Sequence, residues 1–156
     1  MRAAFLFFLF TTTAAAGPYE EATGRVSDVG VGALVVAPLV VTYAQSKDWK
    51  KTGLAAGALA LNGASTFVGK SLVNSPRPDG SGNNGWPSGH TSMAFTGAGL
   101  VCLQTDPMWC GLALGAAAGV GVLRIEAKRH TPEQVAWGVG FGLLHGVLFP
   151  SLTASF

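Results

Sequence analysis

Six apolar stretches, separated by short polar segments, constrain the fold of this chain more than any other feature. None of them alternates polar and apolar residues as a half-buried strand does, and no long run of charge marks a solvated helical face. The pattern therefore predicts an all-α protein, an integral membrane helical bundle of five or six transmembrane helices. The stretches cover approximately residues 2–16, 29–45, 52–69, 91–104, 110–123 and 134–150.

The composition of the chain agrees with a membrane location. Charged residues make up 12% of the chain, about half of the roughly 25% typical of soluble domains. The chain also contains 22 glycines, and small residues let membrane helices pack closely. Several stretches are shorter than the roughly 20 residues of a perpendicular span, so we expect the bilayer to thin locally or flanking polar residues to snorkel. The net charge of +2 is too small to indicate a nucleic-acid partner.

The first stretch has two interpretations. Arg2, the apolar run and the small residues at 14–17 are typical of a secretory signal peptide with its cleavage site. Residues 1–16 could equally remain as a first transmembrane helix. In either case we expect residues 17–156 to form a single membrane domain.

Basic residues predict the orientation of the bundle. Lys47, Lys50 and Lys51 share the loop between the second and third apolar stretches, which is therefore expected in the cytoplasm. Counting spans from this loop places all three polar clusters of the chain, at residues 70–78, 87–90 and 124–134, on the opposite face, which is the periplasm for a bacterial inner membrane. Those clusters carry cations that run against the charge rule, so we expect them to bind an anion.

Three polar clusters lie at the ends of apolar stretches and carry the candidate chemistry. Lys and Arg supply charge-assisted hydrogen-bond donors for a phosphate, and a neutral His can attack phosphorus or pass a proton. This inventory predicts phosphoryl chemistry at a membrane. The clusters are Lys70–Pro78 (KSLVNSPRP), Pro87–His90 (PSGH) and Arg124–Gln134 (RIEAKRHTPEQ).

The clusters resemble the three-part signature of the type 2 phosphatidic acid phosphatase family, which also includes the vanadium haloperoxidases. That signature is Lys, six residues and Arg-Pro; then Pro-Ser-Gly-His; then Ser-Arg, five residues, His, three residues and Asp. Lys70 and Arg77 match the first part, PSGH matches the second in full, and Arg124 with His130 matches the third. The resemblance covers about residues 52–150.

The resemblance implies a role for each matching residue. His130 would attack phosphorus and form a phosphohistidine that water later hydrolyses. His90 would protonate the leaving alkoxide and then activate that water. No metal or other cofactor is implied, because fixed cations already offset the phosphate charge. The phosphate-binding residues implied by the resemblance are Lys70, Arg77, Ser88, Gly89 and Arg124.

Two positions depart from the family. Leu123 stands where the family has Ser, which removes one possible phosphate donor. Gln134 stands where the family has the Asp that accepts a hydrogen bond from the nucleophilic His. The resemblance therefore makes Gln134 the candidate catalytic partner of His130, without the negative charge of the family residue.

Local signals explain how an amide could serve in that place. Thr131 and Pro132 predict a helix start, as N-cap and first helical residue. Gln134 then lies on the face of that helix that His130 approaches, because positions four apart share a face. Glu126 and Glu133 are substitute carboxylates that we rank below Gln134.

The expected function is a membrane lipid phosphatase that hydrolyses a phosphate monoester or diphosphate of a lipid on the non-cytoplasmic face. Candidate substrates are phosphatidic acid, phosphatidylglycerol phosphate, undecaprenyl diphosphate and lipid A phosphate. Alternatives are a phosphotransferase of the same family, or a lipid-phosphate binder whose catalysis is weakened by Gln134. A haloperoxidase is disfavoured because those relatives are larger soluble proteins. The expected partners are the lipid phosphate and membrane lipids, and the sequence predicts no oligomeric state.

Three residues outside the clusters have structural interpretations. Cys102 and Cys110 are expected as free, buried thiols rather than as a disulfide. His145 lies within an apolar stretch, where we expect packing or a local hydrogen bond to hold it.

Overall fold

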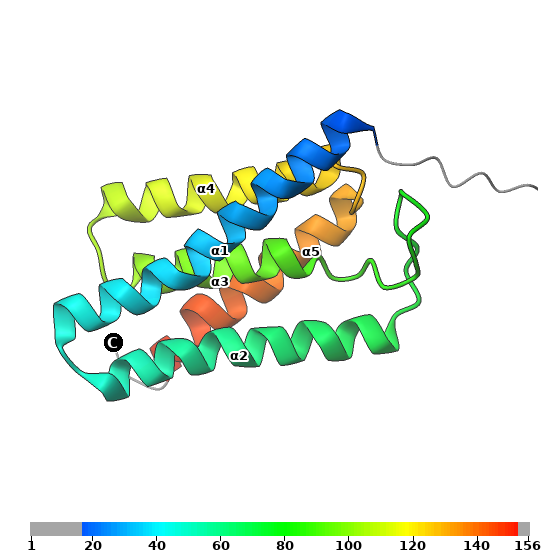
Figure 1. Cartoon of the computed structure of the whole chain (residues 1–156). Helices are drawn as coiled ribbons and strands as arrows, with labels where there is room; N and C mark the ends of the chain where they lie inside the picture. The colour runs from blue at the N-terminus through cyan, green and yellow to red at the C-terminus, as the bar shows by residue number, and fades with distance from the viewer. Residues whose placement is uncertain (1–16, 153–156) are drawn as a thin grey trace, which may run out of the picture.

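The computed structural model describes residues 17–152, so the expected signal peptide or first helix at 1–16 lies outside the described residues. The described residues form helices and no β-sheet, which confirms the all-α prediction (Figure 1). A π-helical turn, η1 (Leu144–Leu148), and a short helix, α6 (Phe149–Leu152), follow the last long helix. The long helices are α1 (Pro18–Ser46), α2 (Trp49–Leu72), α3 (Gly89–Cys102), α4 (Pro107–Glu126) and α5 (Pro132–Leu143).

α3 is the central helix of the bundle. It packs against α1, α2, α4 and α5, and Figure 1 shows it between them. Residues 94–101 of α3 are all buried, and half of them are Ala or Gly. Gly97 faces the backbone of Leu34 in α1, and Gly142 of α5 faces Phe95, so a larger side chain on either glycine would push the helices apart. Small residues therefore allow four helices to pack around α3.

Short-range signals set where the helices begin. Asp48 and Asp106 cap α2 and α4 by accepting hydrogen bonds from backbone N–H groups of the first turn. Thr131 caps α5 and accepts a hydrogen bond from the backbone of Gln134, with Pro132 as the first helical residue. The predicted start of this helix is confirmed, and its side chains are fixed relative to the preceding loop.

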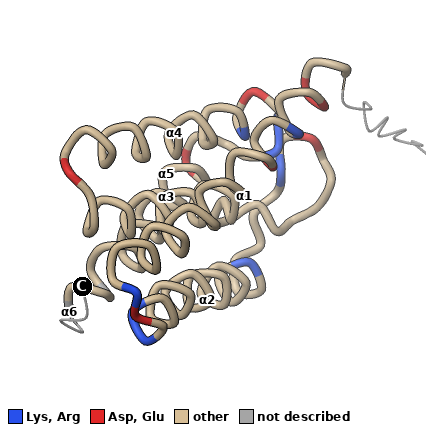
Figure 2. The backbone as a smooth tube through the Cα atoms, turned by 60° about the vertical axis from the view of Figure 1, so that its left-hand side comes forward, with Lys and Arg blue, Asp and Glu red and all other residues tan. Residues whose placement is uncertain are grey.

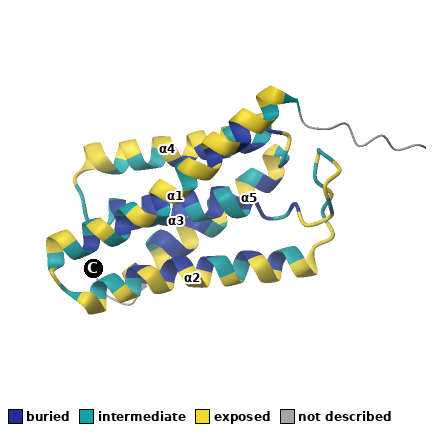
Figure 3. Ribbon diagram, in the orientation of Figure 1, coloured by how far each residue is buried: buried dark blue, intermediate teal, exposed yellow. Residues whose placement is uncertain are grey.

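The surface of the bundle is apolar between two charged ends. Figure 2 shows the charged residues gathered at the ends of the helices, with the middle free of them. Large apolar side chains are exposed along the helices, including Val40, Phe67 and Leu112, and Figure 3 shows this exposed outer face. α1 and α4 are each long and apolar enough to cross a membrane. Such a surface fits the expected membrane bundle, because lipid does not penalise exposed apolar groups as water does.

α1 extends further toward the N-terminus than the sequence indicates. It begins at Pro18, well before the apolar stretch that starts at residue 29. Its first turns are polar, and Glu20 and Asp28 pair with Lys128 and Arg124 across the bundle. Hydrophobic periodicity does not detect these turns, because long-range ion pairs rather than apolar packing satisfy them.

The two cysteines form a disulfide, so the expectation of free thiols is wrong. Cys102 ends α3 and Cys110 lies in the first turns of α4, and the short connection between these helices brings their Cα atoms to 4.3 Å. Leu103 and Lys51 line one cavity, so the bridge lies at the same end of the bundle as the lysine-bearing loop.

Candidate active site

The three polar clusters meet at one end of the bundle. The first runs from the end of α2 into the loop at 73–88, and the second begins α3. The third joins the end of α4 to the start of α5. In Figure 1 these segments lie together at the end opposite the α1–α2 turn. The order of the helices thus brings together side chains that are far apart in the chain.

His130 is buried in the loop between α4 and α5, with 2% of its surface exposed. Its Nδ1 lies 3.1 Å from Oε1 of Gln134 in the first turn of α5. The structure therefore places the amide where the family carries a carboxylate. This contact fixes the ring plane and leaves the other ring nitrogen, Nε2, for chemistry.

Three further hydrogen bonds fix the direction of the Gln134 amide. Its Nε2 donates to Ser75 Oγ and to the Pro76 carbonyl, both at 2.9 Å, and its Oε1 also accepts from the Thr131 backbone N–H at 3.1 Å. A carbonyl only accepts and a backbone N–H only donates, so a flipped amide would lose both of these bonds. Oε1 therefore faces His130, and the neutral ring carries its proton on Nδ1. The lone pair is on Nε2.

The surroundings of His130 favour its neutral form. Its pKa falls to about 4, because the ring is buried and because Arg77, Lys70 and Arg124 add positive charge around it; the hydrogen bond that the ring donates to Gln134 acts in the opposite direction. Cations from three different segments act on one imidazole, so the three clusters share one electrostatic environment. At neutral pH His130 is an unprotonated base.

Asn84 positions two of the cations. Lys70 Nζ donates to the carbonyl oxygens of Asn84 at 2.8 Å and Pro87 at 2.7 Å. Arg77 Nε donates to the side-chain oxygen of Asn84 at 2.9 Å. An ammonium has three donors and a guanidinium five. Within the described chain these bonds leave one donor of Lys70 and the terminal nitrogens of Arg77 for an anion.

Arg124 carries an unpaired donor. Its side chain is buried near the end of α4, and Nη1 donates to Ser27 Oγ at 3.1 Å and to Asp28 Oδ1 at 3.2 Å. Its Nε is also buried and has no hydrogen-bond partner among residues 17–152. A buried donor without a partner is costly. An anion bound in the site would supply the missing acceptor.

The Pro-Ser-Gly-His segment leads into the first turn of α3. Ser88 is fully buried, its backbone N–H donates to the Gln134 carbonyl at 2.9 Å, and its Oγ pairs with Thr91 Oγ1 at 2.9 Å. In the described structure the Ser88 hydroxyl therefore has a partner in α3 and contacts none of the cations. Gly89 begins α3 beside Lys70, with 3.7 Å between a Cβ built on the glycine and Lys70 Cε. The unpaired N–H groups of a helix N-terminus favour an anion there.

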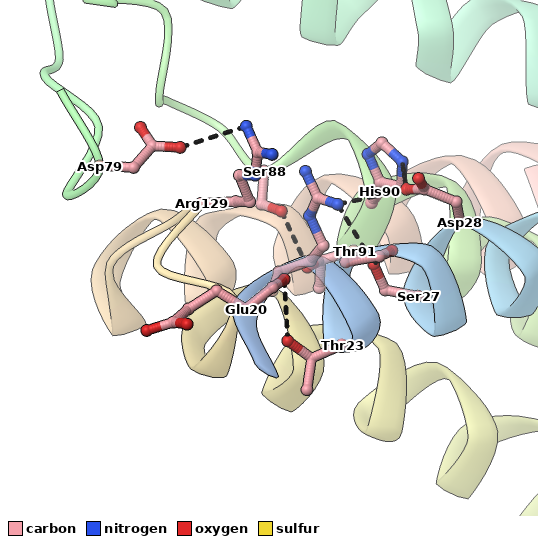
Figure 4. A network of polar contacts seen from close by, with 11 residues as sticks. Glu20, Thr23, Ser27, Asp28, Asp79, Ser88, His90, Thr91 and Arg129 are labelled. Atoms are coloured by element: carbon pink, nitrogen blue, oxygen red, sulfur yellow. Dashed lines mark hydrogen bonds and ion pairs between the residues drawn. The ribbon is translucent and has the colours of Figure 1, made fainter. Parts of the chain in front are cut away.

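His90 and Arg124 share one carboxylate. His90 Nε2 lies 2.9 Å from Asp28 Oδ1, the oxygen that also contacts Arg124 (Figure 4). The side chains of His90 and Asp28 are 36% and 59% exposed, so this contact lies at the mouth of the site. The two histidines of the site therefore have different partners and different access to solvent.

An open cavity of about 580 Å³ lies over this mouth. Cavities of roughly 300–1,000 Å³ hold small ligands in many proteins. Both signs of charge line it, which suits a polar head group better than an apolar chain. The lining residues are Glu21, Gly24, Arg25, Asp28, His90, Arg124 and Arg129.

Comparison with known proteins assigns the fold and the motifs to a family. Residues 51–155 match the family model of the PAP2 superfamily, which is more than half of the chain. The chain belongs to the PAP2 superfamily. The resemblance drawn from the three clusters is confirmed.

Two relatives extend the comparison. This PAP2 chain is 35% identical over 108 residues to the lipid A 1-phosphatase of Porphyromonas gingivalis. The aligned segment covers 67% of this chain and 24% of that protein. The chain thus spans about a quarter of the length of this curated relative. The crystal structure of Aquifex aeolicus LpxE has the same fold, with a TM-score of 0.70, 23% identity, and coverage of 90% of this chain and 88% of that chain.

Three residues that are not part of the PAP2 signature contact or orient the residues of the candidate site. Asn84 positions two cations, and Ser75 helps to orient Gln134. Both lie in or beside the clusters, so their polarity and position are a usable signal. Asp28 lies on α1 and reaches His90 only through the packing of the bundle. No local pattern in the sequence indicates that contact.

The carboxylates weighed as substitutes for the family Asp lie elsewhere. Glu126 is 3.4 Å from the Tyr19 hydroxyl, and Glu133 lines a separate cavity beside the loop at 73–76. Neither contacts His130 in the described hydrogen-bond network. Among the residues that sequence reasoning proposed for this partner role, the structure brings Gln134 alone to Nδ1.

Proposed function

We propose that this protein is a membrane lipid phosphatase that hydrolyses a phosphate monoester or diphosphate of a lipid. The observation that carries the proposal is the fixed Gln134 amide, which keeps the His130 proton on Nδ1 and the lone pair on Nε2. Lys70, Arg77 and Arg124 add positive charge around this neutral ring. A neutral imidazole nitrogen beside an anion-binding group of cations is suited to attack phosphorus.

The proposed reaction has two steps. Nε2 of His130 forms a bond to phosphorus as the bond from phosphorus to the lipid oxygen breaks, and His90 donates a proton to that oxygen. The three cations hold the non-bridging oxygens and stabilise the charge of the transition state. Water then attacks phosphorus and gives a proton to His90, the P–N bond breaks, and inorganic phosphate leaves.

A lipid-linked sugar phosphate is our first candidate substrate. The relative from Porphyromonas gingivalis is named as a lipid A 1-phosphatase. The mixed-charge cavity beside His90 fits a polar head group, and the exposed apolar faces of the helices can contact a lipid tail. Phosphatidic acid, phosphatidylglycerol phosphate and undecaprenyl diphosphate are the other candidates.

We also propose that the site faces the periplasm of a bacterial inner membrane. Lys47, Lys50 and Lys51 lie at the end of the bundle opposite the site, and short loops rich in Lys are retained in the cytoplasm. Four of the cations at the site end have a carboxylate partner in the protein itself. Lys128, Arg25, Arg124 and Arg129 pair with Glu20, Glu21, Asp28 and Asp79, respectively.

The disulfide favours the opposite orientation, because disulfides persist in oxidising compartments. We give the lysine loop more weight, since three cations in one short loop set topology directly. In that orientation the Cys102–Cys110 bridge would lie on the cytoplasmic side. After treatment with a membrane-impermeant reductant, a membrane-impermeant maleimide should label the two cysteines only once the inner membrane is permeabilised, and labelling of intact spheroplasts would reverse the orientation.

A phosphate-release assay tests the function. The purified 156-residue protein is given each candidate lipid phosphate without added metal, with vanadate as inhibitor. We expect vanadate-sensitive release from at least one lipid, and an acid-labile phosphoryl label on the wild type that His130→Ala lacks. Equal background release from both proteins, with retained lipid binding, would instead support a binder. Transfer of the label to an added acceptor lipid without free phosphate would support a phosphotransferase.

A further inference from the structure

A carboxylate from α1 enters the site from outside the segment that matches the family. The family match begins at residue 51, whereas Asp28 lies on α1. Its Oδ1 is 2.9 Å from His90 Nε2 and 3.2 Å from Arg124 Nη1. One oxygen thus contacts both the proposed proton donor and a proposed phosphate-binding cation.

The docking of α1 holds this carboxylate in place. The neighbouring Ser27 is fully buried, and its hydroxyl accepts a hydrogen bond from Arg124 at 3.1 Å. Glu20, two turns earlier, pairs with Lys128 at 2.9 Å beyond the end of α4. α1 also packs along α3 and α4. The position of Asp28 therefore follows from a fixed helix rather than from a free surface side chain.

The charges that face His90 decide what this contact does. The pKa of His90 lies below its usual value, chiefly because the ring is buried and also because Arg124 and Arg77 add positive charge; the Asp28 carboxylate acts in the opposite direction, by charge and by hydrogen bonding. An acid must carry its proton when the leaving group departs. The cavity beside His90 is also lined by Glu21 and Arg25 of α1 and by Arg129.

We infer that Asp28 is a positioning residue for His90, which it orients through Nε2 and whose protonated form it favours, so that Nδ1–H serves the leaving oxygen. This inference rests on the proposed function. A protonated imidazole donates from both nitrogens, so one N–H can stay on the carboxylate while the other gives its proton to the lipid oxygen. The neutral ring that results is the base that activates water in the second step.

Asp28→Asn tests this role through the leaving group. An alkyl oxygen needs a proton as it leaves, whereas a nitrophenolate leaves without one. We expect kcat for a lipid alkyl phosphate to fall about 10- to 100-fold, and kcat for nitrophenyl phosphate to stay within about threefold. The loss of kcat at high pH should begin at lower pH in Asp28→Asn, because the neutral amide no longer favours the protonated ring. Asp28→Glu should restore the wild-type pH profile in part.

Glu126→Gln is the matched control, since it removes one carboxylate at the same end of the bundle without touching His90. In this variant kcat for both substrates should stay within about twofold of the wild-type value. Equal losses on both substrates with an unchanged pH profile would overturn the inference. A lower KM with unchanged kcat would also overturn it, because Asp28 would then only compete with phosphate for Arg124. A wild-type protein that releases phosphate from neither substrate would sink the proposed function instead.

Discussion

The two histidines of the site are held by opposite kinds of partner. His130 is buried, and its Nδ1 meets the neutral amide of Gln134. His90 lies at the mouth of the site, and its Nε2 meets the carboxylate of Asp28. A nucleophile must be neutral and an acid must be protonated, so environments that separate two similar groups assign them different tasks. The resemblance implies a carboxylate beside the proposed nucleophile; Gln134 stands there instead, and a carboxylate stands beside the other histidine.

A third histidine shows what a structural role looks like in this bundle. His145 is buried in η1, with Nδ1 2.7 Å from the Phe141 carbonyl and Nε2 3.0 Å from Ser65 Oγ. Both ring nitrogens are engaged, so neither remains for a substrate. The expectation that packing or a local hydrogen bond holds His145 agrees with these contacts. The histidines of the site differ from it because each has one nitrogen outside such a pair.

Removing the proposed nucleophile should have the largest effect on activity. His130→Ala leaves the cations in place but offers no nitrogen to phosphorus, so we expect phosphate release from the preferred lipid to fall about 10⁴-fold or more. Glu133→Gln changes a nearby exposed residue, and its rate of phosphate release should stay within about twofold of the wild-type rate. Release by His130→Ala above about a tenth of the wild-type rate would assign the nucleophile elsewhere.

The amide partner should matter next. Gln134→Met keeps the length of the side chain but removes its bonds to His130, Ser75 and Pro76. Each buried polar group left unpaired costs about 1–3 kcal/mol, so we expect kcat to fall roughly 10- to 100-fold. The measurement is steady-state phosphate release, with thermal unfolding of the purified variant as a check on folding. A kcat equal to wild type would show that the tautomer of His130 does not depend on Gln134.

The sequence predicted the helices and most residues of the candidate site, each from a different signal. Apolar stretches locate helices whose outer faces meet lipid, and α2, α3 and α4 lie close to the predicted ranges. Fixed motif spacings at helix ends brought Arg77, Arg124 and His130 into one electrostatic environment. Asp28 was missed because its contacts depend on how α1 docks, which no local spacing records. The disulfide was missed because the turn between α3 and α4 sets the distance between the cysteines.

A charge placed beside the nucleophile should shift the acid limb of the pH profile. His130 must be neutral to attack, and its pKa of about 4 means that kcat/KM is retained above that pH and lost as the pH falls through it. Gln134→Glu puts a negative charge beside Nδ1, which favours the protonated ring and should move the acid limb about 1–2 pH units higher. The measurement is kcat/KM for phosphate release from the lipid between about pH 3.5 and 8, a range that includes both the wild-type limb and the shifted limb. An unmoved limb would mean that a group other than His130 sets it.

The smallest expected effect tests how the cations are held. Asn84→Ala removes the acceptor of the Arg77 Nε bond but keeps the backbone carbonyl that Lys70 contacts. One of the two cations is then loosened, so we expect KM for the lipid phosphate to rise about three- to tenfold with little change in kcat. Asn83→Ala is the matched control, because its backbone oxygen and not its side chain accepts from Ser75. If both variants raise KM equally, the effect comes from the loop as a whole. If Asn84→Ala lowers kcat instead of raising KM, Arg77 acts on the transition state more than on the bound lipid.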